Sequence, residues 1–182
     1  MNGTNGWCEP ESRTVAARLQ QLGVCVEVGD PERQLSIAVD IPRLPGWVER
    51  PSTDLPAATV LVNPSAVQRE FTPNAVLLHG RLSERVDSEW LLDGAFEDSR
   101  LLPNWREYEA SRSDFLGCRS AFVRGCYTAG TWVLQATTRY LVIDALAEQY
   151  LTQLTVTTLA SQIDELDADV TVLNLGLQID RR

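Results

Sequence analysis

His79 is the one side chain in this sequence that could act as a general base near neutral pH, because the chain contains a single histidine. A lone imidazole cannot build a histidine-rich metal site, and it leaves one possible base for a serine or cysteine nucleophile. His79 follows two leucines, which is typical of a structural side chain on a strand. The sequence has no G-x-S-x-G elbow and no phosphate-binding glycine loop. A hydrolase that uses His79 is therefore the least favoured function.

The cysteines and basic residues offer no further reactive site. Cys8, Cys25, Cys118 and Cys126 fit no metal-binding spacing such as C-x-x-C. Cys118 and Cys126 fall on one predicted strand, where a rise of about 3.3 Å per residue puts them roughly 26 Å apart, too far for a disulfide. All sixteen basic residues are arginine, so chemistry that needs lysine is excluded. We expect buried thiols, no catalytic residue, no cofactor and no metal ligand.

Charge and hydropathy limit the partners and the location. The net charge of −9 and the pI near 4.6 oppose binding to nucleic acid and anionic lipid. No apolar run reaches the roughly 18 residues of a membrane helix, and the polar start shows neither a signal peptide nor a lipid-attachment motif. We therefore expect a cytoplasmic protein without membrane insertion. Its length predicts a single domain over residues 12–182, after a flexible lead of residues 1–11.

Trp90 is the candidate partner contact. On the helix predicted after Asp87, it lies away from the expected inner face of Leu91, Leu92, Ala95 and Phe96. An exposed tryptophan is a good interface anchor, although a shift in helix register would bury it instead. We expect the other tryptophans that follow turns or begin strands to anchor the core: Trp47, Trp105 and Trp132.

The stretch from Leu116 to Ala160 organises the fold. Its runs of Thr, Val, Leu, Tyr and Trp predict three consecutive antiparallel strands, which are Cys118–Tyr127, Thr131–Ile143 and Gln149–Leu159. The breaks between these strands have the length of hairpin loops. Further strands are expected at Val24–Val28, Leu35–Ile41, Ala58–Val62, Asn74–Leu82 and Trp105–Phe115, with a loop over Val48–Pro56. Few strands are separated by helices, which favours an α+β fold with an antiparallel sheet of six to eight strands covered by helices.

Three helices are expected to cover this sheet. The first begins at Ser12 or Arg13 and ends before Gly23, and the second has about twelve residues. Ser161 and Asp164 suggest a capping box for the last helix. Its apolar stripe consists of Ile163, Leu166, Val170, Leu173 and Leu177.

Several short anchors occur in one order along the chain: Thr14-Val15-Ala16 with Gly23-Val24, Gly29-Asp30-Pro31, Ile41-Pro42 with Pro45-Gly46-Trp47, Asp87 with Leu91-Leu92-Asp93, Leu102-Pro103-Asn104-Trp105, Leu116-Gly117, Ala121-Phe122 and Gly125. The series, over residues 12 to 178, resembles the LpqN/LpqT family of actinobacterial, chiefly mycobacterial, proteins. The resemblance implies a PsbP-like α/β/α sandwich and a non-enzymatic binding role. It supplies no catalytic motif. The best-known members are exported lipoproteins, whereas this sequence shows neither a signal peptide nor a lipid-attachment cysteine.

Two functions follow. The preferred one is a non-enzymatic binding or scaffolding protein that engages a partner protein, with Trp90 as a contact. The alternative is a carrier of a small apolar ligand or lipid in a cleft between the sheet and a helix. We expect such a cleft if the last helix, with Ile163, Leu166 and Val170, sits loosely on the sheet. A fully packed stripe would leave no room for it.

Overall fold

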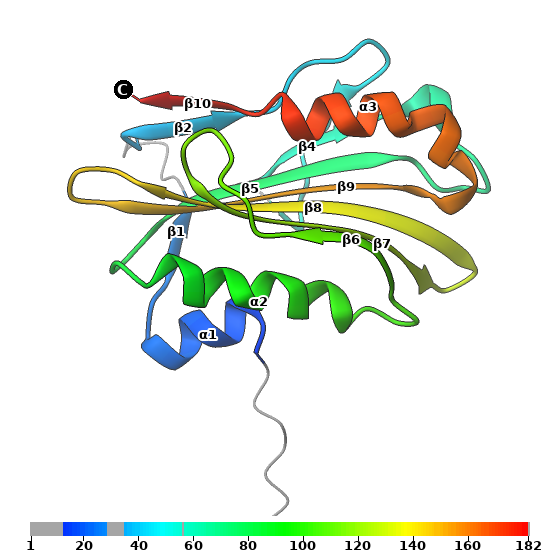
Figure 1. Cartoon of the computed structure of the whole chain (residues 1–182). Coiled ribbons are helices and arrows are strands. Elements are labelled where there is room, and N and C mark those ends of the chain that lie inside the picture. Colours follow the sequence, from blue (N-terminus) through cyan, green and yellow to red (C-terminus); the bar gives the residue numbers. More distant parts are fainter. Residues whose placement is uncertain (1–12, 29–34, 56, 182) are drawn as a thin grey trace, which may run out of the picture.

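The computed structural model describes residues 13–28, 35–55 and 57–181 (Figure 1). The predicted lead of residues 1–11 and Cys8 lie outside them. The main sheet has eight strands: β1 (Val26–Val28), β3 (Val48–Glu49), β4 (Thr59–Val62), β5 (Asn74–Leu82), β6 (Arg106–Ser111), β7 (Arg119–Ala129), β8 (Trp132–Asp144) and β9 (Gln149–Leu159). Their order is β3-β4-β5-β9-β8-β7-β6, and β1 pairs with the second half of β5. Every pairing is antiparallel, as predicted.

The predicted three-strand spine is confirmed as β7, β8 and β9. β7 and β8 pair up to Ala129 and Trp132 across a tight turn at Gly130, whose φ of +59° is in the left-handed region that favours glycine. β8 and β9 pair from Asp144–Gln149 to Leu134–Leu159. These strands are the longest of the sheet because β-branched and aromatic residues run through them with few interruptions.

Helices cover both faces of the sheet (Figure 1). On one face lie α1 (Val15–Leu22) and α2 (Ser88–Arg100), and on the other lie α3 (Ile163–Leu175) and a two-stranded sheet of β2 (Ile37–Asp40) and β10 (Gln178–Arg181). Alternating side chains of each strand feed the two cores. Tyr150 joins the cluster under α3, and the next residue, Leu151, joins the cluster under α1 and α2. The expected sandwich is confirmed.

The helix ends follow their capping chemistry. Thr14 precedes α1, and its Oγ1 accepts a hydrogen bond of 3.1 Å from the Ala17 amide. Gly23 ends the helix with a φ of +69°, as predicted for a C′ glycine. Asp87 caps α2, as predicted, through a 2.7 Å bond from the Trp90 amide.

The structure differs from the prediction in four details. The loop predicted over Val48–Pro56 begins with the short strand β3, and β2 lies outside the main sheet, paired with β10. Ser161 is not the N-cap of the last helix: its hydroxyl donates to Gln68 Oε1 at 2.9 Å, and a 3₁₀ turn over Ala160–Gln162 leads into α3. α3 then ends at Leu175, and the remaining chain forms β10, which local periodicity could not reveal because its partner is β2.

Candidate functional site

His79 is fully occupied by structural contacts. Its Nδ1 lies 2.8 Å from Thr152 Oγ1, its Nε2 lies 3.1 Å from the Ile37 carbonyl oxygen, and its ring stacks on Tyr150 at 5.4 Å between centroids. Burial lowers the pKa of the imidazole, against smaller raising effects from the Ile37 carbonyl and Asp40. These contacts tie β5 and β9 to β2 and leave neither ring nitrogen facing a substrate. In the described ranges, no group of three or more His, Cys, Asp or Glu side chains could hold a metal ion.

The other predicted residues have mixed environments. Trp47 is 4% exposed and donates from its indole Nε1 to Asp169 Oδ2 at 2.8 Å, so it anchors the core as predicted. Trp105 and Trp132 are half-buried and lie outside the two core clusters. Cys118 and Cys126 are buried and Cys25 is exposed, all as free thiols. The expectation of buried thiols was therefore wrong for Cys25.

Trp90 is half-buried. It is therefore neither fully exposed nor fully buried, which were the two alternatives that the sequence left open. It packs against the α1–α2 cluster, and the Arg18 guanidinium carbon lies 4.9 Å from its ring centroid. Arg18 Nη1 also donates to the Trp90 carbonyl oxygen. Trp90 thus holds α1 against α2, and its predicted contact with a partner stays a prediction.

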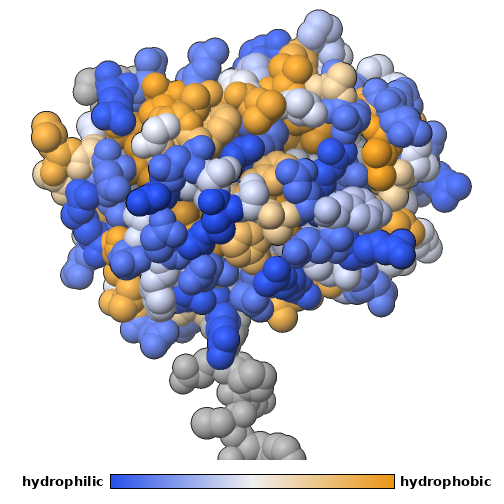
Figure 2. Space-filling view, viewed as in Figure 1, coloured by the Kyte–Doolittle hydropathy of each residue, from blue (hydrophilic) through white to orange (hydrophobic). Residues whose placement is uncertain are grey.

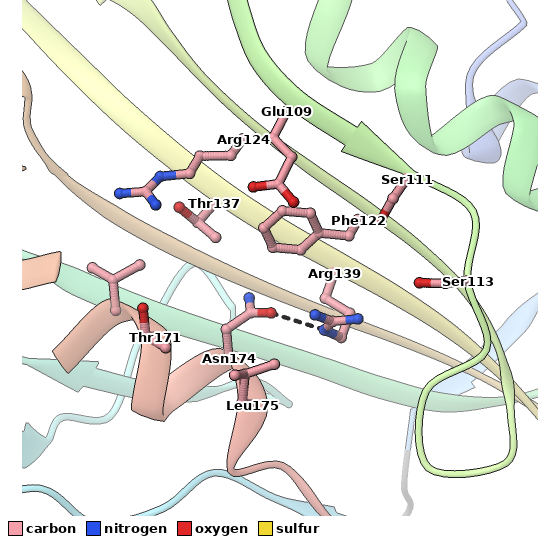
Figure 3. A pocket seen from close by; sticks show the side chains of 11 residues that line it. Glu109, Ser111, Ser113, Phe122, Arg124, Thr137, Arg139, Thr171, Asn174 and Leu175 are labelled. Carbon is pink, nitrogen blue, oxygen red and sulfur yellow. Dashed lines mark hydrogen bonds between the residues drawn. The ribbon is translucent and has the colours of Figure 1, made fainter. Parts of the chain in front are cut away.

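A polar cleft of about 320 Å³ opens between α3 and the outer strands of the sheet (Figure 3). α3 packs on β8 and β9 through Leu166, Val170 and Leu173, so it leaves much of β6 and β7 open on this face. The cleft is lined from three sides: by Glu109, Ser111 and Ser113 of β6 and the loop after it, by Phe122, Arg124, Thr137 and Arg139 of β7 and β8, and by Val170, Thr171, Asn174 and Leu175 of α3.

Arg139 is the most unusual residue of this cleft, because it is an arginine that is only 7% exposed. Its Nε donates to Asn174 Oδ1 at 2.8 Å and its Nη1 to Ser120 Oγ at 3.3 Å. Its guanidinium carbon lies 4.1 Å from the ring centroid of Phe115 and 5.0 Å from that of Phe122. No carboxylate of the described residues lies within 4.0 Å of it. Burial lowers the pKa of the guanidinium, against a smaller raising effect from the Glu109 carboxylate, which lines the same cleft. A buried charge without a counter-charge in direct contact is costly to maintain.

The second arginine of the cleft is neutralised. Arg124 Nη2 lies 2.5 Å from Asp167 Oδ1 of α3. When the Gln135 amide turns its oxygen toward Arg124, that oxygen also accepts from Nη2 at 3.1 Å and from Nε at 3.2 Å.

Two further polar groups of the cleft lack a partner among the described residues: Thr137 Oγ1 and Asn174 Nδ2, on side chains that are each 2% exposed.

A second cleft, of about 280 Å³, is apolar and lies on the opposite face of the sheet, beside α1. α1 supplies Val15, Ala16 and Leu19, and the other lining residues are Val26, Val28, Leu78, His79, Leu151 and Gln153. Val26 and Val28 of β1 are 37% and 43% exposed, so apolar side chains form the rim of the cleft as well as its floor. Gly80 lets β1 approach this closely, because a Cβ there would lie 2.6 Å from Val26 Cγ1.

The last helix packs closely on the sheet, which is the alternative to an apolar cleft beneath it that the sequence left open. Leu166, Val170 and Leu173 are at most 5% exposed, so the stripe is packed and the cleft beside α3 is the polar one. Apolar side chains are nevertheless exposed on that side of the molecule, and Figure 2 shows apolar surface over α3 and the β2–β10 pair. Val172 and Leu175 of α3 are 45% and 56% exposed. No helix in the described part of the chain is both long and apolar enough to span a membrane.

Comparisons with known proteins agree on one family. A family model described as "Probable lipoprotein LpqN" matches residues 11–180. The "Proline-rich 28 kDa antigen" of Mycobacterium tuberculosis is 28% identical over 151 residues, which are 83% of this chain and 49% of that protein. "Putative lipoprotein LpqT" of the same organism is 26% identical over 164 residues, 88% of this chain and 71% of that protein. The chain therefore spans about half the length of the first of these relatives.

The fold has a solved counterpart. The crystal structure of LpqN "involved in cell envelope biogenesis of Mycobacterium tuberculosis" superposes with a TM-score of 0.79 at 20% identity, over 94% of this chain and 99% of that one. At this identity the likeness shows the fold alone, and the family follows from the match over residues 11–180. With its antiparallel sheet covered on both faces and the ordered anchors of its sequence, this chain belongs to the LpqN family of probable lipoproteins.

Proposed function

We propose that this protein is a non-enzymatic binding protein that holds a small apolar ligand in the cleft beside α1. The observation that carries the proposal is the open apolar wall of Val26, Val28 and Leu78, next to the buried side chains of Val15 and Leu151. Water against such a wall is released when an apolar chain covers it, at a gain of roughly 0.8 kcal/mol per buried CH₂ group. The sequence left open whether a ligand cleft lies between the sheet and the last helix. The proposed cleft lies instead between the sheet and α1.

The size of the cleft limits the ligand. At about 280 Å³ it lies just below the usual range of small-molecule sites, which is about 300 to 1,000 Å³. A short alkyl chain, one end of a longer acyl chain or a single ring system fits that volume. Gln153 and His79 are the polar residues of the lining, and the His79 ring nitrogens are hydrogen-bonded to Thr152 and Ile37 on the α3 face of the sheet. We therefore propose an uncharged apolar group as the part that enters.

The experiment is a fluorescence titration with the uncharged probe N-phenyl-1-naphthylamine. Ala16 is an exposed residue of α1 that lines the cleft, so Ala16→Trp would occupy the cleft without removing a core side chain. Gln21→Trp, at an exposed position of the same helix that does not line the cleft, is the matched control. We expect saturable binding to the wild type and to Gln21→Trp. Ala16→Trp should weaken it roughly tenfold, the equivalent of about two CH₂ groups.

Equal affinity of the wild type and both variants would exclude this cleft as the binding site. Native mass spectrometry of freshly purified protein supplies an independent measurement, because a retained apolar ligand adds mass to the folded chain. A ligand-free spectrum combined with no probe binding would reject the carrier function.

A partner protein is the second candidate. It is supported by the part of Trp90 that remains accessible on α2 and by the exposed apolar residues on the α3 face, Val172 and Leu175. Capture from a lysate of the native organism, with Trp90→Ala and the double variant Val172→Ser/Leu175→Ser as baits, tests it. A partner that is lost with one variant and kept with the other would show that the surface altered in the first variant binds this partner. The same set of partners on all baits would reject both surfaces.

The location stays a separate proposal. We expected a cytoplasmic protein from the sequence, whereas the family model and the relative LpqT carry the word lipoprotein in their names. LpqN is described as involved in cell envelope biogenesis, and this supports an envelope-related ligand for the α1 cleft. Cell fractionation with an antibody to the native protein separates the two locations.

A further inference from the structure

We propose that the polar cleft between α3 and the β6–β7 hairpin binds a carboxylate, which pairs with the buried guanidinium of Arg139. This site lies on the other face of the sheet from the apolar cleft and does not depend on the function proposed above. Its ligand is a small monocarboxylate or the carboxylate at the end of a peptide.

Arg139 is fixed in place without a carboxylate in contact with it. The guanidinium is held in one orientation by Asn174 and Ser120 and lies between the rings of Phe115 and Phe122. Its Nη2 makes no hydrogen bond to another described residue, and no described carboxylate is within 4.0 Å. A planar guanidinium fixed in this way presents a free edge whose geometry fits a carboxylate. An exposed arginine would gain little from such a ligand, but a buried one gains a counter-charge in direct contact, which the more distant and exposed Glu109 does not supply.

The polar lining of the cleft has donors that lack acceptors. Thr137 Oγ1 and Asn174 Nδ2 are buried without a partner in the described structure, and both side chains line the same cleft as Arg139 (Figure 3). Buried donors without acceptors are uncommon in folded proteins and cost stability. A hydroxyl, an amide NH₂ and a guanidinium together form a set that is rich in donors. An anion with several acceptor lone pairs satisfies such a set.

The charges around the cleft select a monoanion. Arg124 is already paired with Asp167, so it adds little attraction for a ligand. Glu109 also lines the cleft and is exposed, and the whole chain carries a net charge of −9. A phosphate dianion would meet this negative field with twice the charge of a carboxylate. Phe122 and Leu175 give the body of the ligand an apolar surface to lie against.

The experiment compares benzoate with its neutral isostere benzamide, by calorimetry and by the Arg Nε–Hε signals in ¹H–¹⁵N NMR spectra. We expect benzoate to bind, to shift the Arg139 signal and to bind at least tenfold tighter than benzamide. Arg139→Gln should remove the difference between the two probes. An acetylated tripeptide with a free C-terminus, against the same peptide amidated, shows whether a peptide end is also accepted. Inorganic phosphate that binds more tightly than benzoate would contradict the proposed class of ligand.

Asn174→Asp guards against a folding artefact. Asn174 Oδ1 already accepts from Arg139 Nε, so the nearly isosteric aspartate supplies the missing carboxylate from within the chain. We expect this variant to remain folded and to lose benzoate binding at least tenfold. The matched control is Arg112→Gln, which removes an arginine that already has the acidic partners Glu89 and Asp93 outside the cleft. Benzoate binding that is unchanged in Asn174→Asp, or equal for benzoate and benzamide in the wild type, would overturn the proposal.

Discussion

Arg18 of α1 lies over the indole ring of Trp90 of α2, with its guanidinium carbon 4.9 Å from the ring centroid. Arg18 also bonds to the backbone carbonyl of Trp90 and, at 2.9 Å, to that of Arg13. α1 has eight residues, which is too short for a helix that is stable alone. Contacts with α2 and with the sheet therefore hold α1 at the edge of the apolar cleft.

Replacing Trp90 with Ala should loosen α1. The variant loses the cation–π contact, worth about 0.5 to 2 kcal/mol, together with the apolar contacts of a half-buried ring. We expect faster amide hydrogen exchange over Val15–Leu22 and weaker binding of the apolar probe, with little change over β7–β9. If exchange in α1 is unchanged, Trp90 does not hold this helix, and its accessible edge is better explained by a partner.

Gly94 is a helical glycine whose replacement by Ala should destabilise the protein. On propensity alone, Gly→Ala in a helix gains about 1 kcal/mol. Here a Cβ would lie 2.7 Å from the Val15 backbone nitrogen and 3.0 Å from the Arg13 carbonyl oxygen, so α1 would have to move. We expect a net loss of roughly 1 to 3 kcal/mol in urea unfolding. A more stable variant would show that α1 does not press against α2 at this point.

His79 should make stability depend on pH near neutrality. Its pKa is lowered from the ordinary value of 6.5 in the folded state, because the ring is buried. The unfolded chain therefore takes up a proton that the folded chain resists. The contribution of neutral His79 to the free energy of unfolding is fully present above pH 6.5. It is lost as the pH drops through that value toward the lowered pKa.

The matched measurement is urea unfolding of the wild type and of His79→Gln over about pH 7.5 to 5. The chain has one histidine, so no other imidazole contributes to the difference. Asp98, whose pKa is raised by burial, is present in both proteins and cancels. We expect a smaller pH dependence in His79→Gln. Identical slopes would show that the imidazole is not shielded from solvent.

The thiols should differ in reactivity. In a Cys8→Ser background, Cys25 is exposed and should react rapidly with an aromatic disulfide reagent. Cys118 and Cys126 are 6% and 5% exposed, and burial raises the pKa of the Cys118 thiol, which lowers its thiolate fraction. We expect one fast and two slow thiols, with all three fast in urea. Two fast thiols in the native protein would indicate that β7 opens.

The sequence predicted the parts of the fold that local chemistry determines. β5 and β9 begin and end at the predicted residues, because runs of apolar and β-branched residues stop at clear breaks. Asp87 and Gly23 mark helix ends through their own hydrogen bond or backbone conformation. The pairing of β2 with β10 was not predictable, because it depends on two segments far apart in the sequence.

The candidate sites were harder to predict than the fold. Arg139 was missed, although a signal existed: in β8 it shares a strand face with Leu141 and Ile143, which are both buried under α3. A charged residue on the inner face of a central strand needs an explanation, and alternation alone does not say which face is covered. The sequence left open whether the last helix covers an apolar cleft or is fully packed, because an apolar stripe shows that a helix packs but not how completely.

The binding of straight-chain primary alcohols of increasing length, measured by displacement of N-phenyl-1-naphthylamine, tests the carrier function most directly. Each added CH₂ that enters the cleft should tighten binding about fourfold, which corresponds to roughly 0.8 kcal/mol, until the chain outgrows the cleft of about 280 Å³. Ala16→Trp should reach that plateau at a shorter chain than the wild type or Gln21→Trp. An affinity that does not change with chain length, or one that rises equally in all three proteins, would contradict a ligand held beside α1.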